Sequence, residues 1–177
     1  MSQRRGSRAS EERFPTKGAL HEHVRQILML ERLCSRFHAI ATQLQSRTGG
    51  RATLRVEDED DVRDLLRALL ILEHEDIRPQ VWTPNYAEGS PRMDFLLRIE
   101  RMVVVARMAR DGWGTGELKA QLAEDIQHYR ERPECGTLVY FVYDPERRIP
   151  KPRGVETSLS DEVDGLTVRV IIAPKGL

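Results

Sequence analysis

The sequence predicts an α/β fold, with a mixed β-sheet flanked by helices and preceded by an N-terminal amphipathic helix. Three observations predict this class: heptad-spaced apolar residues near the N-terminus, two later segments with helical apolar spacing, and several short β-branched strands. After the first helix the order is helix, three strands, helix and two strands, which is typical of a sheet covered by helices.

Composition limits the possible functions. A chain of 177 residues can form one domain with an appendage. Its 28 lysines and arginines balance 28 acidic residues, which argues against a general binder of polyanions. Two cysteines lie far apart and outside metal-ligand spacing, so we expect reduced thiols in a cytoplasmic protein. Because no apolar run could cross a bilayer, we expect no membrane partner.

The N-terminal third divides into a tail and a helix. Residues 1–17 are polar and predict a mobile tail, whereas residues 18–50 form an amphipathic helix that ends at Thr48-Gly49-Gly50. Such a wide apolar face needs a partner, and we expect a homodimer seam, with docking onto the main domain as the alternative. The seam consists of Ile27, Leu30, Cys34, Phe37, Ala41 and Leu44.

The main domain is predicted to span residues 51–177. Its first helix starts with an acidic run, which we interpret as a solvated helix terminus rather than a metal site. Trp113 lies in a glycine-rich turn and is predicted to be exposed. The proline-containing segment 145–165 predicts a long surface loop. Further helices are predicted at 58–75 and 117–130, and further strands at 80–83, 138–143 and 166–172.

The segment RMDFLLRIERMVVVARM predicts a β-hairpin centred on Ile99-Glu100. In this register Leu97 pairs with Met102, and continuing the pairing outward places Asp94 opposite Val105. Side chains repeat their face at every second residue, so Arg107 joins that face. One face of the hairpin should therefore present Asp94, Val105 and Arg107 together.

From about residue 58 onward the chain resembles the PD-(D/E)XK nuclease superfamily, which has the restriction-endonuclease-like fold. The resemblance rests on Trp82-Thr83-Pro84-Asn85-Tyr86-Ala87-Glu88-Gly89-Ser90-Pro91-Arg92-Met93-Asp94, on the hairpin, on Phe141-Val142-Tyr143-Asp144-Pro145 and on the ending from Asp164 to Ile171. It implies that Asp94 matches the first catalytic position and that Gln121 matches a glutamine found beside such sites.

The chain departs from that family pattern at two catalytic positions. Val105 stands where the family has a metal-binding glutamate, and Arg107 stands where it has a lysine. Mg²⁺ is usually anchored by one or two carboxylates, and arginine stays protonated and cannot act as a base. We therefore expect a catalytically degenerate protein without a cofactor. The alternative is an active Mg²⁺- or Mn²⁺-dependent DNA endonuclease in which Glu117 or Glu124 supplies the missing ligand.

Arginines around the hairpin indicate a second role. Arg92, Arg107 and Arg110 are candidates for phosphate contacts, although charges that protect a sheet edge would give the same pattern. We expect the partner to be a nucleic acid, DNA in preference to RNA, or another protein. By resemblance, the setting is bacterial DNA processing or defence.

Overall fold

The computed structural model describes residues 17–51, 53–84 and 92–175. The predicted tail therefore falls almost wholly outside the described residues, as do residues 85–91 of the segment that carries the family resemblance. The described elements are α1 (Lys17–Gln45), η1 (Thr48–Gly50), α2 (Glu59–Leu70), β1 (Ile77–Trp82), β2 (Arg92–Leu97), β3 (Met102–Met108), α3 (Thr115–Arg130), β4 (Thr137–Tyr143), α4 (Pro152–Leu159), β5 (Asp161–Val163) and β6 (Leu166–Ala173).

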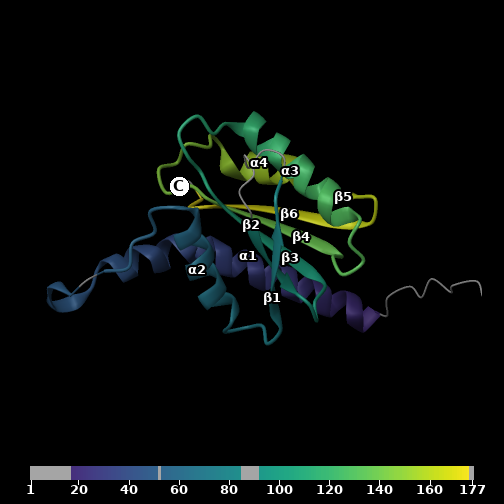
Figure 1. The fold of residues 1–177 in the computed structure, drawn as a ribbon, viewed down its shortest axis with the longest axis horizontal. Helices are drawn as coiled ribbons and strands as arrows, with labels where there is room; N and C mark the ends of the chain where they lie inside the picture. Colours follow the sequence, from purple (N-terminus) through teal and green to yellow (C-terminus); the bar gives the residue numbers. More distant parts are fainter. Residues whose placement is uncertain (1–16, 52, 85–91, 176–177) are drawn as a thin grey trace, which may run out of the picture.

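A six-stranded mixed sheet forms the centre of the molecule, in the order β1-β2-β3-β4-β6-β5. The strands β3, β4 and β6 are parallel, whereas the other neighbouring pairs are antiparallel. The helices α1 and α2 cover one face of this sheet, and α3 and α4 cover the other (Figure 1). The predicted α/β class with a mixed sheet is confirmed. None of the described helices is both long and apolar enough to span a membrane.

The predicted hairpin register is confirmed for the three pairs next to the reversal. Leu97 pairs with Met102 and Phe95 pairs with Val104, with the reversal between them. Alternate residues of these strands consequently face opposite helical layers. Phe95 and Val104 lie in the core beneath α1 and α2, whereas Val105 lies in the core beneath α3 and α4.

The apolar seam of α1 packs against the sheet of its own chain. Phe37 is fully buried, and its ring lies 5.1 Å from that of Phe141 and 4.9 Å from that of Tyr143. Leu44, at the end of the seam, is partly buried against the same core. This corrects the assignment of the seam to a homodimer interface, because the sheet already covers its apolar side chains. It also places α1 in the same core as α2, across the predicted boundary at residue 50.

Two further expectations are wrong. The predicted loop 145–165 contains α4 and β5, since Pro152 begins a helix whose Val155 is buried beside the sheet. An eight-residue helix with so few apolar positions gives a weak periodic signal. Trp113 is buried in the core beneath α3, with 6% of its surface exposed, rather than being solvent-accessible.

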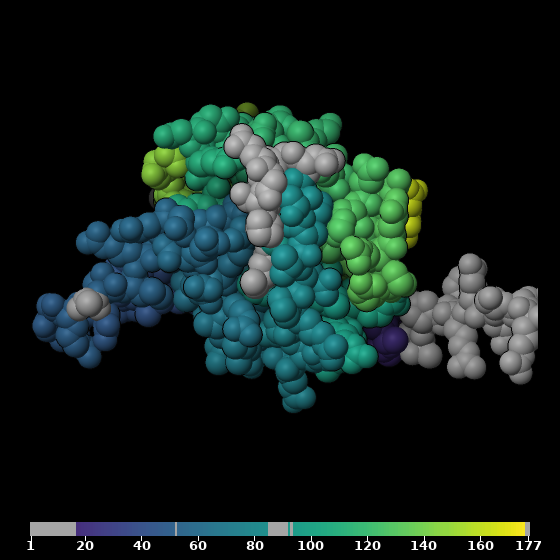
Figure 2. Space-filling model, viewed as in Figure 1, coloured from purple at the N-terminus to yellow at the C-terminus, as the bar shows by residue number. Residues whose placement is uncertain are grey.

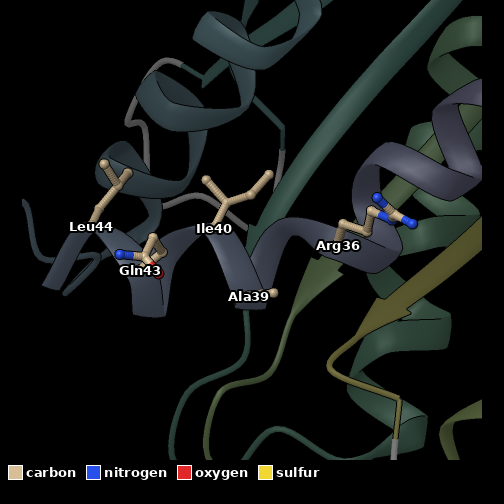
Figure 3. A pocket seen from close by; sticks show the side chains of 5 residues that line it. All are labelled: Arg36, Ala39, Ile40, Gln43 and Leu44. Atoms are coloured by element: carbon tan, nitrogen blue, oxygen red, sulfur yellow. The ribbon is translucent and has the colours of Figure 1, made fainter. Parts of the chain in front are cut away.

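The outward flank of α1 is hollowed near its C-terminal end. Figure 3 shows this hollow with Ile40, Leu44 and Arg36 along it. A neighbouring hollow shares Arg36 and Ile40 and extends to Leu72 beyond α2. The chain around the end of α1 and η1 projects beyond the body of the molecule (blue in Figure 2). This flank is the part of α1 that the sheet leaves uncovered.

Candidate functional site

Asp94 lies in β2 and is fully buried. The Arg92 guanidinium approaches it with two nitrogens, Nε donating to Oδ1 at 2.7 Å and Nη2 donating to Oδ2 at 2.8 Å. Trp82 Nε1 also donates to Oδ2, at 2.9 Å, and the Tyr129 hydroxyl donates to the same oxygen. Burial raises the pKa of Tyr129 well above its usual range, so this hydroxyl keeps its proton and remains a donor. Both oxygens of Asp94 are therefore engaged by protein donors.

Arg92 links Asp94 to a second carboxylate. Its Nη1 donates to Oδ1 and Oδ2 of Asp125 at 2.8 and 2.9 Å, and Asp125 is fully buried in α3. Only 3% of Arg92 is exposed. The Trp82 ring lies 5.0 Å from this guanidinium and stacks in parallel on His128 at 3.9 Å. All three guanidinium nitrogens of Arg92 thus contact the two buried carboxylates.

Arg107 forms the other cationic centre. It is 3% exposed, and its Nη1 donates to Glu59 Oε1 at 2.9 Å while its Nε donates to the Tyr140 hydroxyl at 3.2 Å. Its Nη2 lies 3.6 Å from Asp125 Oδ2, so the two arginines share Asp125. The resulting buried charge network consists of Arg92, Asp94, Arg107 and Asp125, with Glu59 at its edge.

Val105 contributes no polar atom to this network. It is fully buried with the apolar side chains beneath α3, including Leu118 and Leu122. The position where the resemblance implies a metal-binding glutamate therefore belongs to the core.

Glu59 enters the site from the first turn of α2. The helix begins after Asp58, whose carboxylate caps it by accepting from the Asp61 amide at 2.9 Å. The Glu59 side chain is 32% exposed and pairs with both Arg107 and Arg63. Burial raises the pKa of this carboxyl above its usual value, although Arg63 acts in the opposite direction. The interpretation of the acidic run as a solvated helix terminus is thus wrong for Glu59.

The remaining predicted residues lie around the network. Gln121 is buried and donates to Glu117 Oε1 at 2.9 Å. Glu117 is exposed, Glu124 is half-buried, and Arg110 is exposed beyond the end of β3. The α3 carboxylate that enters the network is instead Asp125.

Sequence reasoning missed Asp125, Tyr129, Trp82, Tyr140 and the role of Glu59. For two of them a signal existed. Gln121, Asp125 and Tyr129 follow one another at four-residue steps, which places them on one face of a helix. That face also carries Leu118 and Leu122, so it had to be the buried one. A polar residue on such a face requires a partner, which could have indicated Asp125 as a site residue.

The donor set does not fit a divalent metal ion. Mg²⁺ requires oxygen ligands at about 2.0–2.1 Å in octahedral geometry. Asp94 already accepts hydrogen bonds at both oxygens, and the neighbouring groups Arg92 and Arg107 are cations. Within residues 17–51, 53–84 and 92–175, no cluster of three or more histidine, cysteine or acidic side chains has an arrangement that could hold a metal ion.

Comparison with known proteins gives one match. A family model described as REase_DpnII-MboI matches residues 28–175, which include the sheet, all of its strands and every residue of the buried charge network. Neither the curated proteins nor the solved structures include a significant match. The matched segment covers more than four-fifths of the sequence. The chain therefore belongs to the DpnII-MboI restriction endonuclease family.

Proposed function

We propose that this chain is a non-cleaving member of its family, which binds DNA in bacterial DNA processing or defence. Family membership supports a nuclease-like role in DNA processing. The observation that carries the loss of cleavage is the saturation of Asp94 by Arg92, Trp82 and Tyr129. A carboxylate with both oxygens occupied and with a guanidinium beside it is a poor ligand for a second cation.

The phosphate contacts are proposed to lie outside the buried charge network. Arg92 and Arg107 are buried and paired, so binding a phosphate through either would require breaking an ion pair. Arg110 is exposed and remains the best candidate among the three predicted arginines. Fluorescence anisotropy with labelled duplex DNA over a series of salt concentrations tests this, with Lys119→Ala as the control, because Lys119 is an exposed cation on α3. Arg110→Ala should reduce the salt slope by about one, whereas no binding at low salt would contradict DNA as the partner.

Self-association remains part of the proposal, but with a different surface. Because the α1 seam is covered within the chain, we propose the uncovered flank shown in Figure 3 as the homodimer surface. Leu72 follows α2, is exposed, and lines the neighbouring hollow together with Arg36 and Ile40. Light scattering at micromolar concentration distinguishes monomer from dimer. A dimer that Leu72→Asp converts to monomer would support this surface, and a monomeric wild type would reject it.

The decisive experiment for the proposed function is incubation of the protein with single- and double-stranded DNA and RNA in Mg²⁺ or Mn²⁺. We expect no cleavage above that seen in chelator. Metal-stimulated cleavage that Asp94→Asn abolishes would overturn the proposal.

An active endonuclease is the second candidate, and one observation favours it. The helix α3 places Asp125 within reach of the same guanidinium as Asp94, so two carboxylates do converge on one point. Metal binding there would require Arg92 to leave. In that case Asp125→Asn should abolish cleavage as completely as Asp94→Asn, whereas Glu117→Gln should not.

A further inference from the structure

The space between Asp94 and Asp125 is filled by a single guanidinium. Arg92 donates through Nε and Nη2 to Asp94 and through Nη1 to Asp125, at distances between 2.7 and 2.9 Å. Each carboxylate is fully buried, and Arg92 is nearly so. Two buried carboxylates at one site repel each other unless a cation lies between them. In this chain the intervening cation is covalently attached to β2.

We infer that Arg92 is a resident cation that occupies the place of a divalent metal ion between Asp94 and Asp125. This inference rests on the proposed function and extends it, because it names the residue that excludes the metal. It also assigns Asp125 as the second carboxylate of a latent cation site.

The balance of charge indicates that a divalent metal ion could replace the Arg92 guanidinium but could not bind beside it. Glu59 at the edge of the network is balanced by Arg63, so Arg92 and Arg107 together balance Asp94 and Asp125, with Arg107 Nη2 at 3.6 Å from Asp125. Adding a divalent ion to this neutral network would leave two uncompensated positive charges in a buried place. Removing the Arg92 side chain instead leaves two carboxylates and one guanidinium, so that the network becomes anionic. Such a site should attract a cation.

The hydrogen-bond arrangement also supports replacement of the Arg92 guanidinium by a metal ion. Trp82 and Tyr129 donate to Oδ2 of Asp94, whereas Oδ1 accepts a hydrogen bond from Arg92. Truncating Arg92 therefore releases Oδ1 and, through loss of Nη1, both contacts to Asp125. Oxygen ligands from one or two carboxylates, completed by water, are the usual environment of Mg²⁺ and Mn²⁺.

The test measures metal binding and not cleavage. Thermal unfolding and Mn²⁺ electron paramagnetic resonance are recorded for wild type, Arg92→Ala, Arg92→Lys and Arg92→Ala/Asp125→Asn, in Mn²⁺ and in chelator. Arg92→Ala should melt below wild type in chelator. Mn²⁺ at a hundred times its Kd should raise that Tm by roughly 5–10 °C.

The other proteins serve as controls. Wild type and Arg92→Lys should show no Mn²⁺-dependent shift, because each keeps a cation on β2. Adding Asp125→Asn to Arg92→Ala should remove the shift. If Arg92→Ala folds only in Mn²⁺, the inference is supported even more directly.

Three results would overturn the inference. The first is an Arg92→Ala protein that melts at the same temperature in Mn²⁺ and in chelator, and the second is one that is unfolded in both. The third is stoichiometric Mn²⁺ binding to wild type that Asp94→Asn removes. If the Tm of Arg92→Ala does not change with Mn²⁺ and the wild type does not cleave DNA, the inference fails while the proposed function stands.

Discussion

On the face of the sheet beneath α1 and α2, Phe95 and Val104 pack among apolar side chains, whereas on the opposite face Asp94 lies in a network of buried charges. The two faces belong to the same strands and differ by a shift of one residue along the chain. The apolar face is stabilised by removing hydrocarbon from water. The opposite face combines an apolar core with the buried charge network, and that network is stable only while every ion keeps its partner. The comparison teaches that burial alone does not reveal which face carries function.

The largest expected effect comes from placing a charge on the apolar face. Phe37→Asp removes a fully buried ring and leaves a carboxylate among Phe141 and Tyr143. Loss of the packing alone should cost about 3–5 kcal/mol, and the unpaired charge adds to this, so the protein should not fold. Circular dichroism and size-exclusion chromatography check this, with exposed Ser35→Asp as the control on the same helix. A folded, monomeric Phe37→Asp protein would contradict docking of the seam on the sheet.

Removing one partner from the buried charge network should have the next largest effect. Asp94→Ala leaves Arg92 without one of its two carboxylates and should lower the free energy of unfolding by about 3–5 kcal/mol. Urea denaturation measures this change. Exposed Asp60, which pairs with Arg63 at the surface, is the control, and Asp60→Ala should cost less than about 1 kcal/mol. Equal losses for the two variants would show that the network is not coupled to stability.

Two tyrosines allow a finer comparison of the faces. The Tyr129 hydroxyl bonds to a buried carboxylate, whereas the Tyr143 hydroxyl on the α1 side meets His38 Nδ1 at 3.0 Å. Tyr129→Phe should cost about 1.5–3 kcal/mol and Tyr143→Phe about 0.5–1.5 kcal/mol, because hydrogen bonds to charged groups are the stronger ones. Urea denaturation of both variants tests the order, and the reverse order would contradict it.

The smallest expected effect is the reaction of the two cysteine thiols with a thiol reagent. Cys34 and Cys135 are both buried, one in each core. Burial raises the pKa of Cys135 to about 12 and that of Cys34 further, so neither forms appreciable thiolate near neutral pH. Ellman's reagent should therefore leave the folded protein unmodified at pH 8 and should titrate two thiols in denaturant. Rapid reaction of one thiol in the folded protein would show that the core around that cysteine opens to solvent.

Much of this architecture could be predicted from the sequence, because the decisive patterns are local. The hairpin register follows from the reversal at Ile99-Glu100 between two apolar runs, and the buried face of α1 follows from its heptad spacing. What packs against that face could not be predicted, because the apolar spacing is the same whether the helix packs on its own sheet or on a second copy of the chain.

The composition of the site was harder to predict. Asp94 and Arg107 were expected to lie together, but their connection runs through Arg92 and Asp125, and Asp125 follows both by more than fifteen residues. Contacts between side chains on separate helices and strands depend on tertiary packing, which the spacing of residues in the sequence does not reveal. Arg92 was expected to contact phosphate because an arginine in a sequence carries no information about whether its charge is already paired.

A crystal structure of the wild-type protein grown in Mn²⁺, with anomalous data, would test the central claim most directly. We predict that Arg92 remains hydrogen-bonded to Asp94 and Asp125 and that no anomalous peak lies within coordination distance of Asp94. A manganese ion bound to Asp94, with Arg92 displaced, would contradict the account.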